Sequence, residues 1–399
     1  MTSAIVIGGG IAGCSTAFAL SQRSIAVTLI ERRDKLAQEG SGNPIAMLYP
    51  KFSVKPDFTS LLALQGFQFT LDLLNQLPAN NAIYKACGLI QLAFDAREQA
   101  KQQTILQCQN MAVLQPLDVN TASERAGISL NTGGLYLPQA GWVRPEALCE
   151  TLCNSALITI TTTTNALNIE KKHLQWQVFD DKSNTFEADI VVICNANDIK
   201  QFKPCASIEI IPVRGQVNFF AQNDFSQQIN TIICSDHYLS PAVDGMHTIG
   251  TTYAPNNTNA SLCETDTREN ISALCKISSE LLKNIQTEIT QGRVAWRSQT
   301  LDYMPLAGQL LDEQSIRAKP PRYNANPADL PWLEGLYVNA GHGSKGMITA
   351  PICGELIANL ITNKDLQLDL KLTSKLNPSR FLLRELGLKQ LANSLLQVK

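Results

Sequence analysis

The chain has 399 residues, of which 44% are hydrophobic and 17% charged, and its formal net charge is −2 at pH 7. This composition is that of an ordinary globular protein and excludes a disordered or fibrous chain. A net charge near zero also excludes attraction of the whole molecule to nucleic acid, so any contact with RNA must come from a local patch. The length allows two or three closely joined domains with a large core.

Neither a metal site nor a disulfide framework is expected. The chain has 11 cysteines scattered singly through apolar segments, and four histidines that form no ligand cluster. Such cysteines are typical of reduced, buried thiols, and a first strand that begins at the N-terminus indicates no leader, so we expect a cytoplasmic protein. No apolar run reaches the roughly 18 residues of a membrane span, and no membrane contact is expected.

The N-terminal segment carries a nucleotide-binding motif. Residues 4–7 are typical of a buried parallel strand, and a second strand-like run, 26–30, ends on an acid. Between them, glycines in the GxGxxG spacing permit a tight turn, approach of the backbone to a pyrophosphate and close packing of a helix. A purely structural turn is the alternative, but the complete order favours FAD or NAD, with the acid accepting hydrogen bonds from the ribose hydroxyls. The predicted cofactor-binding residues here are Gly8, Gly10, Ile11, Ala12, Gly13 and Glu31.

A loop and two helices are predicted next. Ser41, Gly42 and Asn43 are small, hydrogen-bonding residues suited to close approach to a ligand, although a surface loop is an equal alternative. Residues 58–77 have apolar side chains at helical spacing, and Pro145 marks the start of another helix.

From residue 157 the pattern becomes that of β-structure. Residues 157–169 and 173–181 are predicted to be paired strands, with Leu174, Trp176 and Val178 on one face, and 187–196 is predicted to be a central strand. Strands of a more antiparallel sheet are expected at 210–221 and 247–253, and helical structure at 263–288.

A second glycine motif lies near the C-terminus. Residues 336–361 predict a strand, a glycine turn and a helix, and the turn has the sequence GHGSKG. Its backbone N–H groups and helix dipole are suited to stabilising negative charge on a reduced isoalloxazine. The alternative is an ordinary strand-to-helix turn. The nucleotide-binding motif at the N-terminus makes this alternative less favoured. The predicted flavin-binding residues are Gly341, Gly343, Ser344, Lys345 and Gly346.

Longer motifs carry a resemblance to a known family. These are SGN and LYP at 41–50, GWVRPEAL at 141–148, PVRGQV at 212–217, IGTTY at 249–253, RSQTLDYMPLAG at 297–308 and LNPSRFLLREL at 376–386. With them the chain resembles the D-amino-acid-oxidase-like family of FAD amine oxidases, and within it the FAD-dependent half of bifunctional bacterial enzymes that modify 2-thiouridine in tRNA. The methyltransferase half of that branch has no counterpart here, so methylation is expected from a separate methyltransferase or not at all.

The resemblance and the order of elements imply the fold. We expect an α/β protein with an α+β insertion, in which a Rossmann-type FAD-binding domain is interleaved with an antiparallel-sheet substrate domain. The predicted FAD-binding domain comprises 1–55, 140–205 and 295–370, and the substrate domain comprises 56–139 and 206–294. Residues 371–399 are predicted to form a basic helical tail.

The resemblance also implies a reaction. The carboxymethylaminomethyl group of a 2-thiouridine at the tRNA wobble position is expected to lose hydride from its glycyl α-carbon to FAD, and hydrolysis then gives an aminomethyl group and glyoxylate. Dioxygen is the expected reoxidant. The alternatives are a small amino acid oxidase acting on glycine, sarcosine or D-amino acids, and a non-catalytic flavin-binding subunit.

An arginine is expected to bind the substrate carboxylate, because its guanidinium offers a bidentate fork. Arg297 heads the segment that matches the family's flavin-adjacent block, with Asp302 orienting that segment; a structural ion pair is the alternative for both. Arg214 is a second candidate, with the alternative that it covers the sheet.

Three further residues are candidates for the substrate side or the flavin. Lys51 and Lys345 lie on loops expected to face the flavin, unless they are solvated surface lysines, and Tyr253 is placed to stack on the substrate base, unless it is a core residue. Residues 301–337 contain no cysteine, and a cysteine there tethers flavin in some relatives, so non-covalent FAD is expected. The basic tail, with Arg380 and Arg384, is the predicted tRNA-backbone contact, with a solvated helix face as the alternative.

Overall fold

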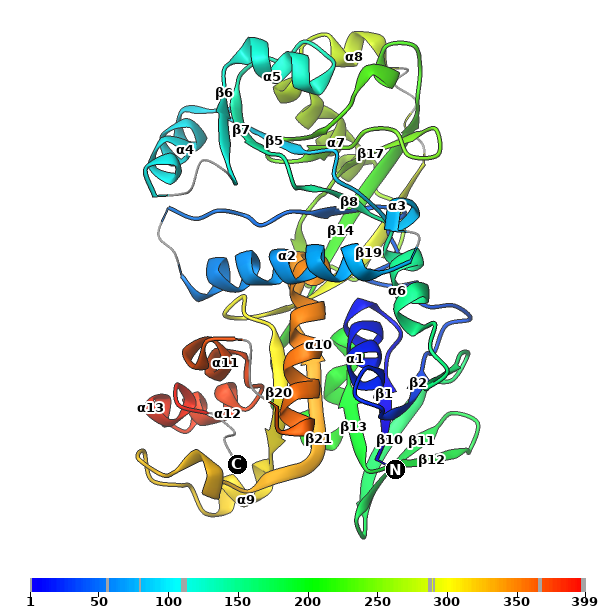
Figure 1. Cartoon of the computed structure of the whole chain (residues 1–399), viewed down its shortest axis with the longest axis vertical. Helices are drawn as coiled ribbons and strands as arrows, with labels where there is room; N and C mark the ends of the chain where they lie inside the picture. Colours follow the sequence, from blue (N-terminus) through cyan, green and yellow to red (C-terminus); the bar gives the residue numbers. More distant parts are fainter. Residues whose placement is uncertain are drawn as a thin grey trace.

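A mainly parallel sheet forms the lower half of the molecule (Figure 1). In the computed structural model, which describes residues 2–395 except 55–56, 79, 109–112, 286–288, 290 and 365–367, neighbouring strands of this sheet come from distant parts of the chain. β1 pairs in parallel with both β2 and β13, whereas β20 runs antiparallel to β21. In spatial order the strands are β20 (Leu306–Leu311), β21 (Trp332–Ala340), β13 (Ile190–Ile193), β1 (Ser3–Ile7), β2 (Ala26–Ile30) and β9 (Ile158–Thr161).

The two faces of this sheet are covered by different layers. Successive side chains of a strand point to opposite faces, so Val6 packs with the helices on one face and Ile7 packs on the other. The helices are α1 (Ile11–Ser21), α6 (Pro145–Cys153) and α10 (Gly346–Thr362). The other face carries β10 (Ala166–Lys172), β11 (Gln175–Asp180), β12 (Thr185–Ala188) and the 3-10 helices η1 (Ala196–Gln201) and η2 (Lys203–Cys205).

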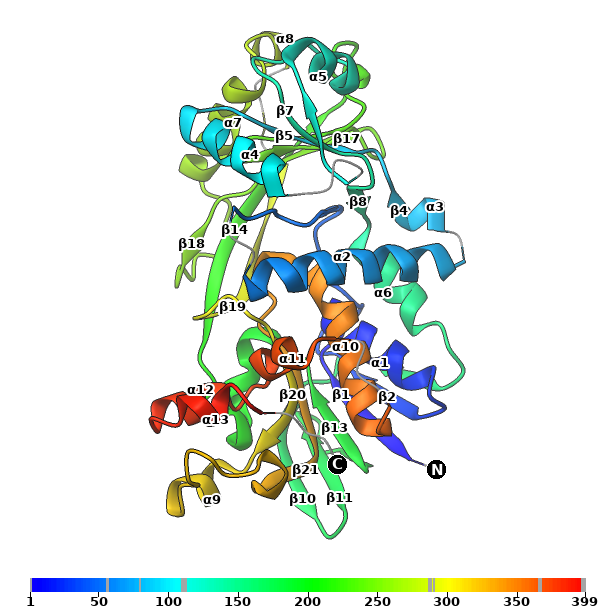
Figure 2. The same cartoon turned by 60° about the vertical axis from the view of Figure 1, so that its left-hand side comes forward.

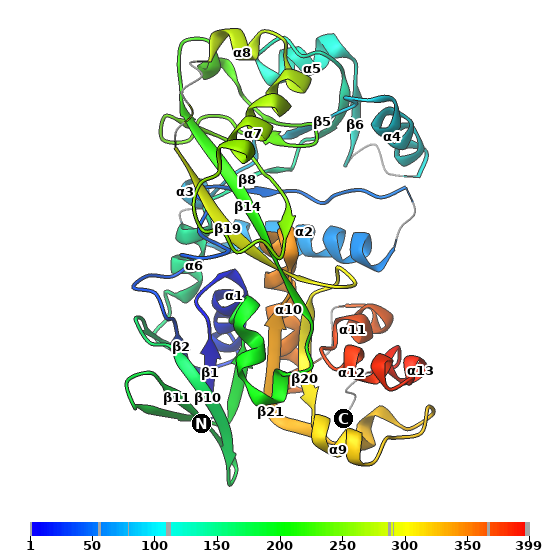
Figure 3. The same cartoon turned by 180° about the vertical axis from the view of Figure 1, so that it is seen from behind.

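A second, mixed sheet forms the upper half. Its longest strands, β14 and β19, pair antiparallel and run diagonally from the upper half toward the lower one (Figure 3). In spatial order its strands are β18 (Ala254–Pro255), β14 (Ile210–Ala221), β17 (Met246–Gly250), β16 (Tyr238–Leu239), β15 (Ile232–Cys234), β5 (Leu89–Leu92), β7 (Gly134–Leu137) and β6 (Gln115–Leu117), with β19 (Gln291–Thr300) beside β14.

Helices and short elements complete the upper half. They are α3 (Asn80–Ile83), α4 (Ala96–Cys108), α5 (Val119–Ala126), α7 (Glu264–Ile277), α8 (Leu281–Asn284) and η3 (Ser226–Gln228). A small sheet lies between the halves and consists of β3 (Ala46–Leu48), β8 (Gly141–Val143) and β4 (Tyr84–Lys85). The connection from β20 to β21 contains α9 (Glu313–Ala318) and η4 (Pro327–Asp329).

The long helix α2 (Phe58–Gln76) crosses α10 (Figures 1 and 2). Gly66 makes this crossing close, because a Cβ there would lie 2.2 Å from the carbonyl oxygen of Ile348. Thr70 Oγ1 donates a hydrogen bond to Met347 O at 3.2 Å. The apolar face of α2 therefore joins the core that α1, α6 and α10 form on one face of the parallel sheet. The sequence prediction had instead grouped residues 56–139 with the substrate domain.

Three local expectations were wrong. Residues 157–169 divide between β9, which pairs with β2, and β10, which pairs with β11. Leu174 lies in the turn between β10 and β11 and is 87% exposed, so it does not share the buried face of Trp176 and Val178. The C-terminal region forms the short helices α11 (Leu370–Leu376), α12 (Arg380–Glu385) and α13 (Lys389–Ala392), because Pro378 and the left-handed Gly387 interrupt the helical pattern.

No helix within the described ranges has both the length and the apolar content that crossing a membrane requires. Ten of the 11 cysteines have side chains that the structure describes, and these ten are free thiols.

Candidate functional site

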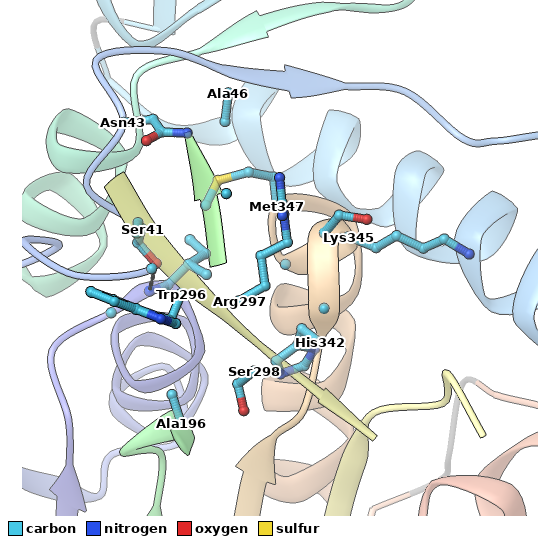
Figure 4. Close-up of a pocket in the computed structure, with 18 of the residues that line it drawn as sticks. Ser41, Asn43, Ala46, Ala196, Trp296, Arg297, Ser298, His342, Lys345 and Met347 are labelled. Carbon is cyan, nitrogen blue, oxygen red and sulfur yellow. Dashed lines mark hydrogen bonds between the residues drawn. The ribbon is translucent and has the colours of Figure 1, made fainter. Parts of the chain in front are cut away.

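A cleft of about 1320 Å³ lies between the two halves of the molecule. Its lower wall is formed by the turns that follow β1 and β21, and its upper wall by strands of the mixed sheet and by α4. Figure 4 shows side chains from these distant segments around one pocket. Most sequence-predicted residues meet here, namely Gly8, Gly10, Ile11, Ala12, Glu31, Ser41, Asn43, Lys51, Tyr253, Arg297, Gly341, Gly343, Ser344, Lys345 and Gly346.

The turn after β1 needs its glycines for steric reasons. Gly8 has φ +108°, and a Cβ there would lie 2.7 Å from the carbonyl oxygen of Cys194, which directly follows the neighbouring strand β13. A Cβ at Gly13 would lie 1.8 Å from the carbonyl oxygen of Gly8. Gly13 therefore does not line the cleft; it lets α1 begin directly beneath the turn, so that the helix N-terminus faces the cleft.

Glu31 ends β2 with its carboxylate fixed at the cleft wall. Oε2 accepts a hydrogen bond from the N–H of Gly9 at 2.6 Å, and Oε1 accepts one from the N–H of Arg33 at 2.7 Å. Burial raises the pKa of Glu31, and these two hydrogen bonds oppose the rise. The carboxylate has further lone pairs, which are suited to accepting hydrogen bonds from ribose hydroxyls.

The loop after β2 closes over the start of α1. Ser41 Oγ accepts a hydrogen bond from the N–H of Ile11 at 3.0 Å. Arg293 of β19 holds the loop from above, donating to Asn43 Oδ1 at 3.0 Å and to the carbonyl of Glu39 at 2.6 Å. A Cβ at Gly42 would lie 2.5 Å from the Arg293 guanidinium, so this glycine admits the arginine and does not itself line the cleft.

The turn after β21 forms the opposite part of the lower wall. Gly341 and Gly343 have φ +74° and +58°, conformations that favour glycine, and η5 (Gly343–Lys345) leads into α10. His342 is anchored by contacts of Nε2 with Asn339 Oδ1 and Nδ1 with Thr349 Oγ1, both 2.9 Å. Burial lowers the pKa of His342 to about 3, so the ring is neutral at physiological pH.

The residues at this end fit a flavin dinucleotide. The carboxamide of Asn195 lines the cleft next to Gly8, and its buried Oδ1 and Nδ2 have no hydrogen-bond partner among the described residues. A bound nucleotide would satisfy such atoms. The N-terminus of α1 and the Gly8 turn are suited to the pyrophosphate, Glu31 to a ribose, and the turn at 341–346 to the isoalloxazine.

Arg297 projects into the cleft from β19 (Figure 4). Its Nη2 donates to Thr251 Oγ1 at 2.9 Å and its Nη1 donates to the carbonyl of Thr252 at 3.3 Å. No carboxylate in the described part of the chain pairs with it. Burial lowers the pKa of Arg297, but an arginine keeps its charge. A partly buried guanidinium without an anionic partner is suited to binding a ligand carboxylate.

Lys51, Tyr253 and Lys345 lie at the edge of the cleft. Lys51 and Tyr253 are exposed, and the Tyr253 hydroxyl contacts the Gln299 carboxamide at 2.9–3.1 Å. Lys345 points away from Arg297 (Figure 4). Burial lowers the pKa of Lys345, opposed by nearby Asp57 and reinforced by Lys51, so these three groups are neighbours.

Arg214 does not fit its expected place on the substrate side. It is 1% exposed and does not line the cleft. Its guanidinium forms an ion pair with Asp266 of α7 and donates to the carbonyl oxygens of Asn259 and Ser261. The reason is its position on the ladder between β14 and β19, where Arg214 lies opposite Trp296. Because successive residues of a strand point to opposite faces, Arg214 and Trp296 share one face and Arg297 lies on the other. The alternative, an arginine covering the sheet, describes it better.

Asp302 does not pair with Arg297. It accepts hydrogen bonds from Arg380 at 2.8 and 3.0 Å and from Arg384 at 2.7 Å. Burial would raise the pKa of Asp302, but the two arginines outweigh burial and lower it to about 2. Arg380 is 0% exposed, so it is not available for the predicted contact with an RNA backbone. The last residue of the predicted basic tail, Lys399, lies outside the described residues.

Sequence reasoning missed several residues of the cleft. Gly215 lies beneath the Arg297 guanidinium, and a Cβ there would be 2.6 Å from Nη1. Tyr49 and Tyr238 line the same end of the cleft, where burial raises the pKa of both hydroxyls. Gly215 stands in the PVRGQV motif, where a glycine within a strand signals close approach of another group; the tyrosines and Arg293 have no such signal.

Comparisons with known proteins agree with this geometry. Residues 3–360 match the family described as DAO, FAD dependent oxidoreductase. The chain is similar to the tRNA 5-methylaminomethyl-2-thiouridine biosynthesis bifunctional protein MnmC of Methylobacillus flagellatus, with 41% identity over 98% of this chain and 61% of that protein. The protein of the same name from Pseudomonas savastanoi pv. phaseolicola is 38% identical over 96% of this chain and 59% of its own length. The chain thus spans less than two thirds of these curated relatives.

Solved structures show the same fold. Glycine oxidase from Geobacillus kaustophilus has a TM-score of 0.74 at 21% identity, covering 93% of this chain and 97% of that one. L-proline dehydrogenase from P. horikoshii has a TM-score of 0.76 at 20% identity, and the match covers 97% of this chain and 98% of that one. These likenesses confirm the predicted α/β fold with a second sheet. That sheet is mixed and not purely antiparallel, because β15 pairs in parallel with β5.

Proposed function

The chain belongs to the FAD-dependent oxidoreductase family, and from this premise we propose that it oxidises the 5-carboxymethylaminomethyl group of a 2-thiouridine at the wobble position of tRNA. The products are the 5-aminomethyl nucleoside and glyoxylate. The observation that carries the proposal is the 41% identity, over 98% of this chain, to a protein named for tRNA 5-methylaminomethyl-2-thiouridine biosynthesis. A tRNA substrate would also place the protein in the cytoplasm.

The proposed reaction breaks a C–H bond next to a secondary amine. When bound, FAD supplies the acceptor for the hydride that leaves the glycyl α-carbon. The substrate is then an imine, and water adds to it to release glyoxylate and leave the amine on the nucleoside. The chain must therefore orient the α-carbon, keep the amine neutral and admit one water.

Arg297 is our candidate for orienting the substrate. Its partly buried guanidinium, which has no anionic partner among the described residues, is suited to a bidentate hydrogen bond with the glycyl carboxylate, which fixes both the position and the rotation of the CH₂ group. Its positive charge, with that of Lys51 at the cleft edge, disfavours a proton on the substrate amine. A neutral amine releases hydride more readily, so the same cations assist the chemical step.

The shape of the cleft favours a substrate larger than a free amino acid. Beyond Arg297 the cleft continues beneath α4, where apolar and polar side chains line it together. The apolar ones are Leu89, Ile105, Leu135 and Leu137, and the polar ones include Gln91, Glu98 and Lys101. Glycine and sarcosine have no group to place against these walls, whereas a nucleobase attached to the amine does. This extension supports a nucleoside-linked amine as the substrate.

The test is anaerobic reduction of the bound flavin. We expect tRNA carrying the carboxymethylaminomethyl-2-thiouridine to bleach the flavin absorbance and yield stoichiometric glyoxylate, while the same tRNA without the modification leaves the absorbance unchanged. Bleaching by free glycine, sarcosine or D-amino acids but not by the modified tRNA would replace the proposal with a small amino acid oxidase. No bleaching by any of these amines would indicate a flavin-binding subunit without this activity.

A further inference from the structure

A strip of exposed aromatic and aliphatic side chains, with two partly buried cations among them, lies beside the cleft. We call it the rim and define it by Phe58, Leu301, Tyr303, Lys375 and Arg384. Phe58 begins α2, Leu301 and Tyr303 follow β19, and the two cations stand on α11 and α12. Figures 1 and 2 both show the start of α2 close to α11 and to the turn after β19.

Contacts join the residues of the rim to one another. The Lys375 ammonium lies 5.3 Å from the centre of the Phe58 ring. Arg384 Nη1 lies 2.7 Å from Asp302 Oδ2, and Asp302 stands between Leu301 and Tyr303 in the chain. The charges of Arg384 and Asp302 also act on the pKa of Lys375, the first lowering it and the second raising it. These contacts hold Phe58, Lys375 and Arg384 next to the turn that carries Leu301 and Tyr303.

The rim is continuous with the edge of the cleft. Asp57, which caps α2 directly before Phe58, is close enough to Lys345 for each to affect the pKa of the other. Lys345 lines the cleft and is itself a neighbour of Lys51. A ligand that fills the cleft and extends past these two lysines meets the rim next.

The rim carries a surplus of positive charge on a chain whose net charge is −2. Asp302 is shared by Arg380 and Arg384, so two guanidinium groups face one carboxylate. Arg380 is completely buried and its charge is offset by Asp302. The charges of Arg384 and Lys375 are left for an anion outside the protein.

The apolar members of the rim are unusually exposed for their size. The exposed fraction is 65% for Tyr303, 52% for Leu301 and 38% for Phe58. Exposed aromatic rings next to cations are the combination that binds single-stranded nucleic acid, because bases stack on the rings and phosphates pair with the cations.

We propose that the rim binds the RNA-loop nucleotides that flank the oxidised uridine. In this arrangement Lys375 and Arg384 contact phosphates and a base stacks on Tyr303. The inference rests on the proposed function, since it assigns a place to the part of the tRNA that stays outside the cleft. It also replaces the predicted basic helix by a surface that α11 and α12 share with the turn after β19.

Binding is tested with the holoenzyme and a fluorescein-labelled anticodon stem–loop RNA that lacks the modification. We expect K375A/R384Q to lower the slope of log affinity against log salt by about 1.4, which corresponds to two lost phosphate contacts. Y303N keeps a residue that tolerates φ +59° and should raise Kd about 5-fold or more through the lost stack. The control is K172A, an exposed lysine on the β10–β11 hairpin, which should bind like the wild type.

Kinetics separate this inference from the proposed function. With the modified tRNA, the rim variants should raise KM and leave kcat unchanged; with the free modified nucleoside, kcat/KM should match the wild type. Unchanged Kd and KM in all rim variants would overturn the rim and leave the proposed function standing. Rim-dependent RNA binding by a wild type that oxidises neither tRNA nor nucleoside would support the rim as an RNA site and overturn the proposed reaction. Equal flavin content and thermal unfolding midpoints verify that the variants are folded.

Discussion

The two ends of the cleft are built by different means. At the cofactor end, consecutive residues supply backbone N–H groups around Gly8, and one carboxylate, Glu31, is fixed by the N–H groups of Gly9 and Arg33. At the substrate end, side chains come from strands far apart in the chain, and Arg297 faces the cleft only because of its register on β19. A site made of backbone depends on local steric fit, whereas a site made of side chains depends on which face of a strand each residue occupies.

The ladder between β14 and β19 illustrates the second case. Arg297 lies opposite Val213 and faces the cleft, while Arg214 lies opposite Trp296 and faces α7. A shift of one position along this ladder separates an arginine that faces the cleft from one that is the buried partner of Asp266. The following predictions test whether the two ends fail in these two different ways.

The largest effect is expected from G13V. A Cβ at this position would lie 1.8 Å from the carbonyl oxygen of Gly8, so α1 cannot begin beneath the turn without moving the backbone that we propose binds the pyrophosphate. We expect the purified protein to contain no flavin, as measured by its absorbance after gel filtration. G245A is the control for adding a methyl group to a glycine, because Gly245 is left-handed (φ +76°) but a Cβ there meets nothing within 4 Å. It should cost about 1–2 kcal/mol of stability and keep its FAD. Stoichiometric FAD in G13V would show that the turn is not the cofactor site.

The next effect is expected from R297Q, at the substrate end. Removing a bidentate, charged hydrogen bond to a carboxylate should cost about 2–4 kcal/mol, which is a loss of about 30- to 1000-fold in kcat/KM. Flavin content should not change, which distinguishes this variant from G13V. The matched test uses the substrate with its carboxylate replaced by an amide. The wild type should lose activity on the amide by a similar factor, and R297Q should hardly distinguish the two. Equal discrimination by both proteins would remove Arg297 from the carboxylate site.

The same contrast explains how much could be predicted from the sequence. The turn at Gly8 and the helix that begins at Pro145 were predicted because each depends on neighbouring residues alone. The roles of Arg214 and Asp302 were not, because they depend on strand register and on the burial of Arg380 at a distant position. Gly215 could have been noticed as a glycine within a strand, but nothing in the sequence names the arginine that lies over it.

A smaller effect is expected on the pH dependence of folding stability, through His342 at the cofactor end of the cleft. Burial lowers the pKa of His342 to about 3, whereas in the unfolded chain it is about 6.5. Between these values the unfolded state holds a proton that the folded state excludes, so stability falls as the pH falls. From pH 7 to pH 5 the loss through this group should be about 2 kcal/mol. Urea unfolding should show the wild type losing about that much more than H342Q over this range. His247, also buried with a lowered pKa, contributes equally to both proteins. Parallel pH profiles would mean that His342 takes up a proton in the folded protein.

The smallest and most specific effect is expected from G215A. An added Cβ would lie 2.6 Å from Nη1 of Arg297, the end of a flexible side chain, so the guanidinium can move aside while the backbone stays in place. Folding and FAD content should therefore be unchanged. A guanidinium displaced by about 1 Å should still bind the carboxylate but orient the α-carbon poorly, and we expect kcat/KM to fall about 10-fold. A double-mutant cycle decides whether Arg297 mediates this loss. In the R297Q background G215A should have no further effect, because the group that it displaces is gone. A full 10-fold loss in that background would instead mean that Gly215 itself leaves room for the substrate, and that backbone shape matters at both ends of the cleft.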